Sequence, residues 1–247
     1  LENFKGCPYL CDFCDAKKPV TNRDIDSTLE ELVYLYLMGI KKYYFIDLTF
    51  GLNKRKTNEL LSRLKQFRYE NPDFGFRCVT RADRVTEEFV VDLLDAGCYE
   101  VGIGLETNDD KLLVSMKKKT SENLYSNALK ILGESGILFK LFLIEGYKGS
   151  NSGISRKTFQ LLNELQNRKY KYFVQPALSR DIIPSLDGFR EREENGLLRR
   201  GTMSQLDFRH DCREYGWDND RTIRAICYHM LAYPSTEISK DRTDKGL

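Results

Sequence analysis

The sequence predicts an α/β protein, a partial (βα)6 TIM-like barrel followed by a C-terminal helical and irregular extension. β-Branched and aromatic runs alternate with amphipathic helical patterns along most of the 247 residues, which is typical of a parallel sheet with crossover helices. Each strand–helix period takes roughly 30 residues. A complete eight-fold barrel needs about 250 residues, whereas the sixth strand already ends near residue 177. A partial barrel therefore fits better.

The first half of the chain opens with a short strand and continues with strand–helix units. Capping residues 24–28 precede the first helix, whose apolar residues recur at helical spacing until Gly39. A dense aromatic and β-branched run from Tyr43 is typical of a buried parallel strand. Residues 86–88, Thr-Glu-Glu, begin the third helix in the manner of a capping box, and Gly97 closes it. We expect strands over residues 1–5, 43–48 and 74–80, and helices over residues 29–39, 54–69 and 86–96.

The second half repeats this alternation until it stops near residue 177. We expect strands over residues 100–105, 138–145 and 171–175, and helices over residues 121–135 and 155–167. Residues 178–247 are different, with a charge-dense stretch at 190–200, a helical pattern at 220–231 and a polar tail at 235–247 that we expect to be disordered. The chain is therefore expected to have a barrel core over 1–177 and an extension over 178–247 that packs on it.

Composition excludes several classes of function. The net charge is +2, with 39 basic and 37 acidic residues, so a nucleic-acid partner is not expected. The sequence has no apolar run long enough to span a membrane and no signal-peptide pattern. Seven cysteines, an odd number in a chain of this kind, argue against a disulfide framework and favour a reducing, cytoplasmic location.

Three cysteines near the start carry the strongest chemical signal. Cys7, Cys11 and Cys14 follow the spacing C-x3-C-x2-C within one short segment, which is the usual way for a loop to hold an iron–sulfur cluster. Three thiolates on a four-iron cluster leave one iron open, and open positions belong to catalytic metal sites. The alternative is a zinc-binding knuckle completed by a distant ligand.

This loop, with aromatic Phe13 just before the third cysteine, resembles the signature of the radical S-adenosylmethionine (SAM) enzymes. The preceding Gly6 and the following Pro8-Tyr9 are most similar to the branch often associated with a cobalamin-binding domain. The resemblance implies a [4Fe–4S] cluster on the three cysteines and SAM bound at the open iron. It also implies reductive cleavage of SAM to a 5′-deoxyadenosyl radical that takes hydrogen from a substrate.

The resemblance also suggests SAM contacts at the carboxyl ends of the second and third strands, where parallel barrels carry their active sites. Asp47 and Thr49 occupy a segment similar to one that holds the methionyl part of SAM, although Asp47 could simply cap its loop. Arg81 lies in an Arg-x-Asp sequence with Asp83, and it suits a carboxylate by bidentate pairing. The alternative for Arg81 is an ion pair with Asp83.

The fourth and fifth strands resemble the family more closely. Gly104 and Glu106 lie in Gly-Ile-Gly-Leu-Glu-Thr, similar to a segment that contacts the ribose or amino group of SAM. Ile144 stands where an apolar residue supports the adenine. Phe13 completes the residues that we expect to contact the cofactor.

Other residues have simpler interpretations. The lysine run 117–119 is typical of a solvated loop, with a substrate contact as the less favoured alternative. Cys78 and Cys98 are interpreted as small buried apolar residues. A second metal site, built from His210, Cys212, Cys227 and His229, is conceivable but disfavoured, because the last two residues point in different directions on a helix.

The leading hypothesis is an oxygen-sensitive radical SAM enzyme that acts on a small-molecule or peptide substrate and takes electrons from a donor such as flavodoxin or ferredoxin. The sequence leaves the net reaction open among methyl transfer, rearrangement and other C–C or C–H modification. One alternative is the core of a cobalamin-dependent radical SAM methyltransferase whose cobalamin domain lies outside this chain. Another is a non-catalytic zinc-binding interaction module.

Overall fold

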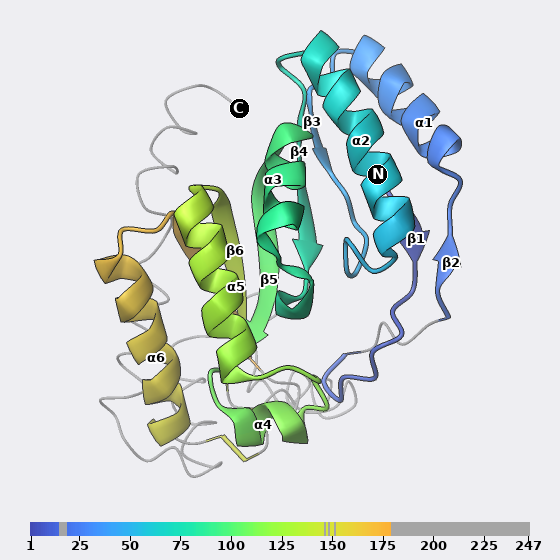
Figure 1. Ribbon diagram of the computed structural model, residues 1–247. Helices are drawn as coiled ribbons and strands as arrows, with labels where there is room; N and C mark the ends of the chain where they lie inside the picture. Colours follow the sequence, from blue (N-terminus) through green and yellow to red (C-terminus); the bar gives the residue numbers. More distant parts are fainter. Residues whose placement is uncertain (15–18, 146, 148, 151, 179–247) are drawn as a thin grey trace, which may run out of the picture.

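The computed structural model describes residues 1–14, 19–145, 147, 149–150 and 152–178 (Figure 1). Its centre is a sheet of five parallel strands in the order β3-β4-β5-β6-β7. Strands that are neighbours in the sheet are also successive in the chain, so each connection is a crossover that carries a helix. The strands are β3 (Lys42–Tyr44), β4 (Gly75–Thr80), β5 (Cys98–Glu106), β6 (Leu138–Glu145) and β7 (Tyr172–Leu178).

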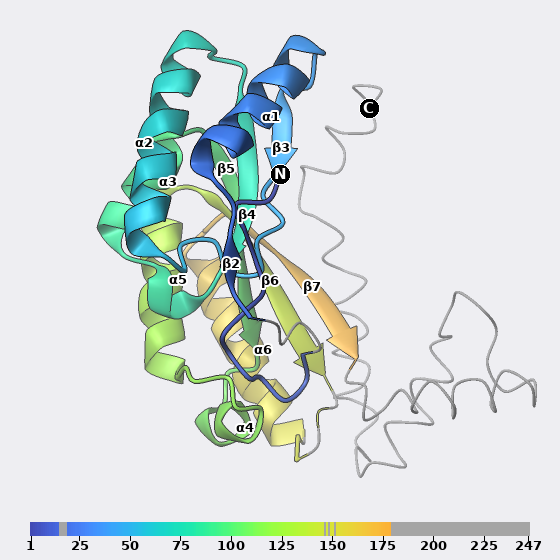
Figure 2. The same cartoon turned by 90° about the vertical axis from the view of Figure 1, so that its right-hand side faces the viewer.

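The crossover helices α2, α3, α5 and α6 cover one face of the sheet (Figure 2). A short helix, α4, lies at the carboxyl ends of the strands, toward which the arrowheads point in Figure 1. The helices are α1 (Ile25–Leu37), α2 (Lys54–Glu70), α3 (Glu87–Asp95), α4 (Asp110–Ser115), α5 (Glu122–Ser135) and α6 (Ser152–Asn167), with a 3-10 turn η1 (Ala82–Arg84). This arrangement confirms the predicted α/β fold of the partial-barrel kind. Within the described residues no strand closes the sheet into a full barrel.

Capping side chains explain where the crossover helices begin. Asn53 caps α2, Thr86 caps α3 and Ser121 caps α5, each accepting a hydrogen bond from a backbone N–H in the first turn. Gly136 ends α5 in the left-handed conformation, with φ of 74°. The predicted helix over 86–96 is confirmed in this way, although the cap itself lies outside α3.

The core lies between the sheet and the helix layer. Leu60 and Leu64 of α2 are fully buried against an aromatic group on and beside β3 and β4. The Phe45 and Phe76 rings meet edge to face, with 5.3 Å between centroids. This packing fixes the strands whose carboxyl ends carry the candidate site.

The first predicted strand is wrong in extent and pairing. Only β1 (Phe4–Lys5) is a strand, and it pairs antiparallel with β2 (Thr21–Asn22), which the sequence did not predict. Leu1 alone makes the expected parallel contact, donating to the Tyr44 carbonyl at 2.9 Å. The physical reason is that the backbone N–H groups of residues 3 and 4 donate to the side chain of Asp47 instead of to a strand.

Several boundaries differ from expectation: α1 begins at Ile25 rather than at residue 29, α6 begins at Ser152 rather than at residue 155, and β7 ends at Leu178 rather than at residue 175. β3 ends at Tyr44 rather than at residue 48, although Phe45 and Phe50 still donate to carbonyls of residues 77 and 79 beside β4. Helix α4 was not expected, because no element was predicted between the strand over 100–105 and the helix over 121–135. Asp109 starts that helix by accepting from the Leu112 N–H at 3.0 Å.

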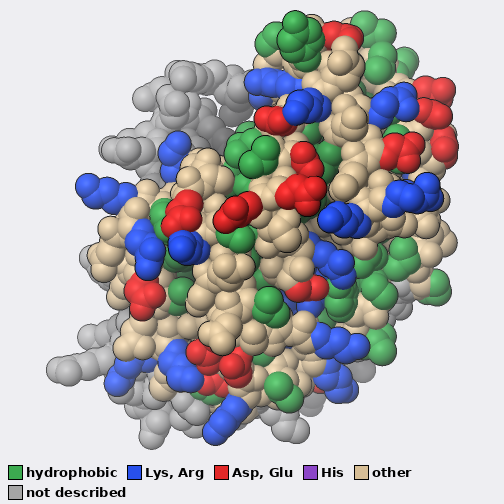
Figure 3. All heavy atoms as spheres, viewed as in Figure 1, with side chains coloured by type: hydrophobic (Ala, Val, Ile, Leu, Met, Phe, Trp, Pro, Cys, Tyr) green, Lys and Arg blue, Asp and Glu red, His purple; other side chains and the backbone are tan. Residues whose placement is uncertain are grey.

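The predictions for residues 179–247 lie outside the described residues, including the helix at 220–231 and the site of His210, Cys212, Cys227 and His229. In the part of the chain that the structure describes, no helix is both long and apolar enough to cross a bilayer. On the face shown in Figure 3, Lys and Arg side chains are interspersed with Asp and Glu.

Candidate functional site

The cysteine loop carries three free thiols. Cys11 is buried, with 7% exposure, while Cys7 and Cys14 are partly exposed. The Cys14 N–H donates to the Cys11 carbonyl at 3.2 Å, which turns the end of the loop. Burial raises the pKa of the Cys11 thiol, and the positive charges of Lys118 and Arg81 oppose that rise.

Tyr9 fixes one side of the loop against the end of β4. Its ring lies under the guanidinium of Arg81, 3.7 Å from the centroid. Its hydroxyl accepts from Arg84 Nη2 at 2.8 Å and donates to Asp83 Oδ2 at 3.3 Å. We call these four residues, Tyr9, Arg81, Asp83 and Arg84, the tyrosine clamp.

The other side of the loop rests on α4. The Asp12 N–H donates to the Met116 carbonyl at 2.9 Å, and the Asp12 carboxylate accepts from Lys117 and Tyr147 at 3.1 Å each. Phe13 packs on the small apolar cluster of Leu112, Met116 and Tyr147, and Ile144 packs on the same cluster. The structure therefore brings Phe13 and Ile144, both predicted cofactor contacts, to one patch beside the cysteines.

A buried ion pair lies at the carboxyl end of β5. Lys118 Nζ is 2.7 Å from Glu106 Oε1, and both side chains are 9% exposed. Glu106 has a φ of 61°, which is uncommon for a residue other than glycine. A Cβ at Gly104 would lie 2.6 Å from Glu106 Oε1 and 2.7 Å from Lys118 Nζ. Glycine at position 104 therefore makes room for the pair.

Arg81 joins the pair to the cysteine loop. Its Nε donates to Asp83 Oδ1 at 2.8 Å, and its Nη2 donates to the carbonyls of Lys118 and Lys119 at 2.9 Å each. The Arg81–Asp83 pair considered from the sequence is thus present, but Arg81 is buried rather than a surface residue. Most of its donors serve to hold neighbouring segments in place.

Asp47 and Thr49 lie deeper, each with 2% exposure. The Asp47 carboxylate accepts from the Phe4 N–H at 2.8 Å and from the Asn3 N–H at 3.2 Å. Burial raises its pKa to about 6, against the lowering effect of those backbone bonds. Thr49 Oγ1 donates to the Leu48 carbonyl at 2.8 Å. Asp47 thus holds the segment that leads into the cysteine loop.

Lys118 and Tyr9 are the site residues that sequence reasoning missed. Lys118 belongs to a run of lysines interpreted as solvated, and its burial depends on the left-handed φ angles of Lys117 and Lys119, 53° and 52°. The signal that could have identified Lys118 was the run of three lysines between the strand that ends at Glu106 and helix α5. Tyr9 offered only its place inside the cysteine loop.

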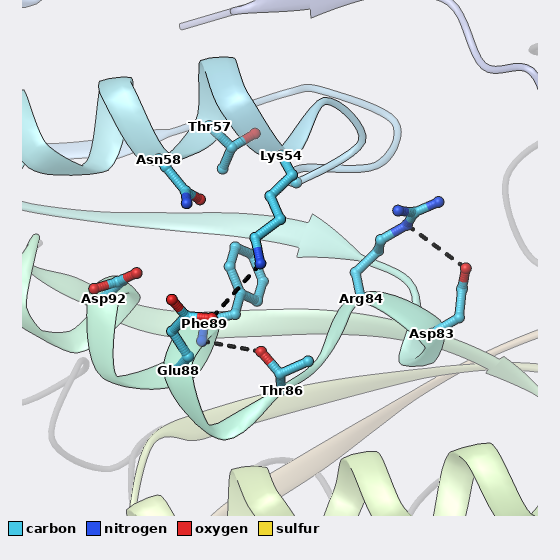
Figure 4. Close-up of a pocket in the computed structure, with 10 residues that line it drawn as sticks. Lys54, Thr57, Asn58, Asp83, Arg84, Thr86, Glu88, Phe89 and Asp92 are labelled. Carbon is cyan, nitrogen blue, oxygen red and sulfur yellow. Dashed lines mark hydrogen bonds and ion pairs between the residues drawn. The ribbon is translucent and has the colours of Figure 1, made fainter.

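A separate pocket lies between α2 and α3 and collects none of the predicted cofactor contacts (Figure 4). Its volume is about 150 Å³. Lys54 pairs with Glu88 across it at 3.6 Å, and Arg84 pairs with Asp83 at 3.6 Å. Asp92 also lines it, so acidic and basic groups nearly balance there. It adjoins the cysteine loop only through Asp83 and Arg84 of the tyrosine clamp.

The cysteine loop has the chemistry that an iron–sulfur cluster requires. It supplies three reduced thiols from one segment, and two cationic side chains act on the buried one, which suits a thiolate-bound anionic cluster. Among the described residues, no three Cys, His, Asp or Glu side chains lie close enough to hold a single metal ion. The thiolate ligands of a four-iron cubane stand around a larger body than one ion.

Comparison with known proteins gives one sequence family and several relatives. The profile of the Radical SAM superfamily matches residues 2–151. The chain is 30% identical over 213 residues to "Uncharacterized methyltransferase sll1242" of Synechocystis, covering 81% of this chain and 39% of that protein. It is 28% identical over 138 residues to "Uncharacterized methyltransferase PH0819" of Pyrococcus horikoshii, covering 54% and 29%. The chain thus spans well under half of the length of either relative.

A solved structure shares the fold. The radical S-adenosylmethionine methyltransferase TsrM from Kitasatospora setae, determined with cobalamin and a [4Fe–4S] cluster bound, superposes with a TM-score of 0.65 at 22% identity. The match covers 72% of this chain and 33% of TsrM. Because the profile match spans more than half of the sequence and contains the whole cysteine loop, the chain belongs to the Radical SAM superfamily.

Proposed function

We propose that this chain binds a [4Fe–4S] cluster through Cys7, Cys11 and Cys14. We also propose that it binds SAM beside the cluster and cleaves SAM reductively. The observation that carries the proposal is the position of the cysteine loop. The tyrosine clamp and α4 hold the cysteine loop beside the buried Glu106–Lys118 pair, with Lys118 Nζ 5.5 Å from the Phe13 ring centroid, where the strands end. Parallel barrels place their active sites at this edge.

The Glu106–Lys118 pair is suited to a zwitterion. The methionyl end of SAM carries an ammonium and a carboxylate, and each has a partner of opposite charge in the pair. We propose that Glu106 and Lys118 contact this end or the ribose hydroxyls next to it, and that Gly104 keeps the space open. Phe13 and Ile144 offer the apolar surface on which the adenine would rest.

Arg81, Asp47 and Thr49 have a different proposed part. Arg81 and Asp47 spend most of their hydrogen-bonding capacity on backbone groups and on Asp83. Arg81 would therefore orient the cysteine loop and the lysine loop, residues 117–119. Asp47 would orient the N-terminal segment. The Thr49 hydroxyl already donates to a carbonyl, so it would contact SAM only as an acceptor, or the contact would be through the Thr49 backbone.

When bound, the cluster supplies the electron that divides SAM into methionine and a 5′-deoxyadenosyl radical, which takes a hydrogen atom from a small-molecule or peptide substrate. The electron would come from a protein such as flavodoxin or ferredoxin, in the cytoplasm. We also propose that residues 178–247 form an extension packed on the barrel core.

A second candidate is a cobalamin-dependent methyltransferase. Both relatives above are named methyltransferases, and the TsrM structure contains cobalamin. Since this chain spans 39% or less of those relatives, cobalamin would be bound by a part of the protein outside these residues. Methylcobalamin-dependent methyl transfer to a substrate, measured with the complete protein, would favour this candidate.

The test is anaerobic reconstitution with iron and sulfide, followed by reduction in the presence of SAM and assay for 5′-deoxyadenosine. We expect about four irons per chain and deoxyadenosine above background. Cys11→Ala should lose both, while Cys98→Ala, a buried cysteine outside the loop, should keep both. Zinc in place of iron, with no SAM cleavage, would instead favour the interaction module.

A further inference from the structure

The sheet face turned away from the helices has a cavity of about 260 Å³. Its walls come from every strand of the sheet, and on β5, β6 and β7 the lining residues lie three or more residues before the strand ends. On β5 and β6 the lining residues alternate along the strand, as the period of two requires. The lining residues that matter are Tyr44 on β3, Arg77 on β4, Glu100 on β5, Lys140 and Phe142 on β6, and Gln175 on β7.

The charges in this cavity do not balance. Arg77 and Glu100 are register partners on neighbouring strands, and their side chains pair at 3.6 Å. Lys140 is the remaining cation, and among the described residues no carboxylate lies within ion-pair distance of it. One positive charge is therefore left over in a cavity that is partly shielded from water.

Aromatic rings surround the unbalanced lysine. Its Nζ lies 4.9 Å from the Phe142 ring centroid and 5.4 Å from that of Phe173. On the other side, the Arg77 guanidinium stacks on Tyr44 at 4.5 Å. Burial lowers the pKa of Lys140, and Glu100 raises it while Arg77 lowers it further. A bound anion would relieve the repulsion between the two cations.

The same face leads to the candidate cofactor site. Gly102 lines the cavity, and Glu106 follows four residues later on β5, which corresponds to about 13 Å along the strand. On β6, Ile144 stands four residues after Lys140, at the same spacing. A molecule that reaches from the cavity to the strand ends would need a body of roughly that length.

We propose that this cavity binds the carboxylate end of an organic acid with an aromatic or otherwise apolar body, and that Lys140 is the group that recognises the acid. Resting on the proposed function, this molecule is the substrate, whose other end lies toward the SAM site. Lys140 pairs with the carboxylate, Arg77 stays paired with Glu100, and Phe142 and Phe173 contact the apolar body. Because Arg77 is already paired with Glu100, Lys140 alone is left to match the ligand, and one cation matches a single negative charge better than a dianion.

The experiment uses the intact chain without added iron, so that its result does not depend on SAM chemistry. Calorimetric titration with 3-phenylpropionate measures binding of the acid, and 3-phenylpropionamide serves as the neutral analogue of the same shape. Lys140→Met removes the charge and keeps the chain length. Lys130→Met is the control, because Lys130 is an exposed lysine on α5 with its own partner, Glu134, at 3.8 Å.

We expect saturable binding of the acid, at least tenfold weaker binding of the amide, and at least tenfold weaker binding of the acid to Lys140→Met. Lys130→Met should bind like the unmodified chain, and Lys140→Arg should keep most of the affinity even if Lys140→Met folds poorly. Equal binding of acid and amide, no saturable binding of the acid, or an unaffected Lys140→Met would overturn the proposal. None of these results bears on the deoxyadenosine assay, which tests the proposed function separately.

Discussion

Lys118 and Glu106 form the ion pair in which both partners are most deeply buried among the described residues. Removing two charges from water is costly, and their attraction alone often fails to offset that cost. The residues flanking Lys118, and Glu106 itself, adopt left-handed backbone conformations, which adds strain of order 1 kcal/mol or more at each position. Burial and strain concentrated at one strand end are typical of a site that binds a ligand.

Replacing Lys118 with Met should therefore impair both stability and cofactor binding. Glu106 would be left buried without a counter-charge, and the expected loss is about 3–5 kcal/mol in the free energy of unfolding. Affinity for SAM, measured by titration of the reconstituted chain, should fall at least tenfold. Lys130→Met is the control, since Lys130 makes only an exposed pair with Glu134 on the same helix and should cost about 1 kcal/mol or less. A Lys118→Met chain that binds SAM normally would contradict the proposed contact.

Gly104→Ala tests the same site from the backbone side. The new methyl would meet the ends of the Glu106 and Lys118 side chains at 2.6 and 2.7 Å, so the pair must move while the fold stays intact. We expect normal iron content and weakened SAM binding. Gly75→Ala is the comparison, because its methyl would also meet a lysine end, Lys42 Nζ at 2.8 Å, at the far end of the sheet. Equal SAM affinity in both variants would argue against the role of the pair.

Asp47 makes a prediction about pH. Its pKa in the folded chain is about 6, above the ordinary 3.8, so the folded state binds its proton more tightly than the unfolded state. Stability from this residue is greatest below about pH 4 and is lost as the pH rises through 6, by up to about 3 kcal/mol. The free energy of unfolding of the unmodified chain, taken relative to that of Asp47→Asn, should therefore fall by about 2–3 kcal/mol between pH 4 and pH 7 in urea titrations.

At the residue scale, the sequence identified the chemistry but not all of its partners. The three cysteines, Glu106 and Gly104 stand out by type and spacing, and their roles in binding the cluster and SAM remain predictions. Lys118 could not be identified, because its burial depends on two left-handed neighbours and on carbonyl bonds from Arg81, far away in the chain. Long-range contacts of that kind leave no local pattern.

At the scale of elements, the tyrosine clamp links the cysteine loop to the end of β4. Arg81 stacks on Tyr9 and also bonds the carbonyls of two residues in the lysine loop. A planar guanidinium can stack and bond in several directions at once, which an ammonium cannot do. The clamp therefore couples the cluster loop to the Glu106–Lys118 pair.

Arg81→Ala should loosen the cysteine loop, with faster hydrogen exchange at residues 9–14 and lower iron retention after reconstitution. Arg81→Lys should restore little of either property, because the stacking and the carbonyl bonds need the fork of the guanidinium. Arg63→Ala removes an exposed pair with Asp26 on the helix layer and should change neither. If Arg81→Ala left exchange in the loop unchanged, the clamp would not be what positions it.

The predictions of elements were correct where the apolar periodicity was strong. They were wrong where a side chain accepts the backbone hydrogen bonds that a strand would have made. Helices α2, α3 and α5 and strands β4 and β6 were placed within a residue or two, because apolar spacing and capping residues mark them. The first strand was wrong, since Asp47 takes the donors of residues 3 and 4. Helix α4, only six residues long, is too short for a periodic signal.

For the whole molecule, the open sheet has helices on one face and a cavity on the other. The βα alternation predicted this architecture, and the location of the cysteine loop at the strand ends followed from it. The cavity was not predicted, because it depends on which residues of separate strands lie side by side. Register is set by tertiary pairing, and a shift of one residue would reverse the two faces.

The most direct test of the central claim is the electron paramagnetic resonance spectrum of the reduced, reconstituted chain before and after addition of SAM. We predict a [4Fe–4S] signal that shifts when SAM is added, because SAM would bind at the iron that lacks a cysteine. We also expect the shift to need a higher SAM concentration in Lys118→Met and Gly104→Ala, while the signal without SAM is unchanged. A cluster signal that SAM does not alter would contradict the account.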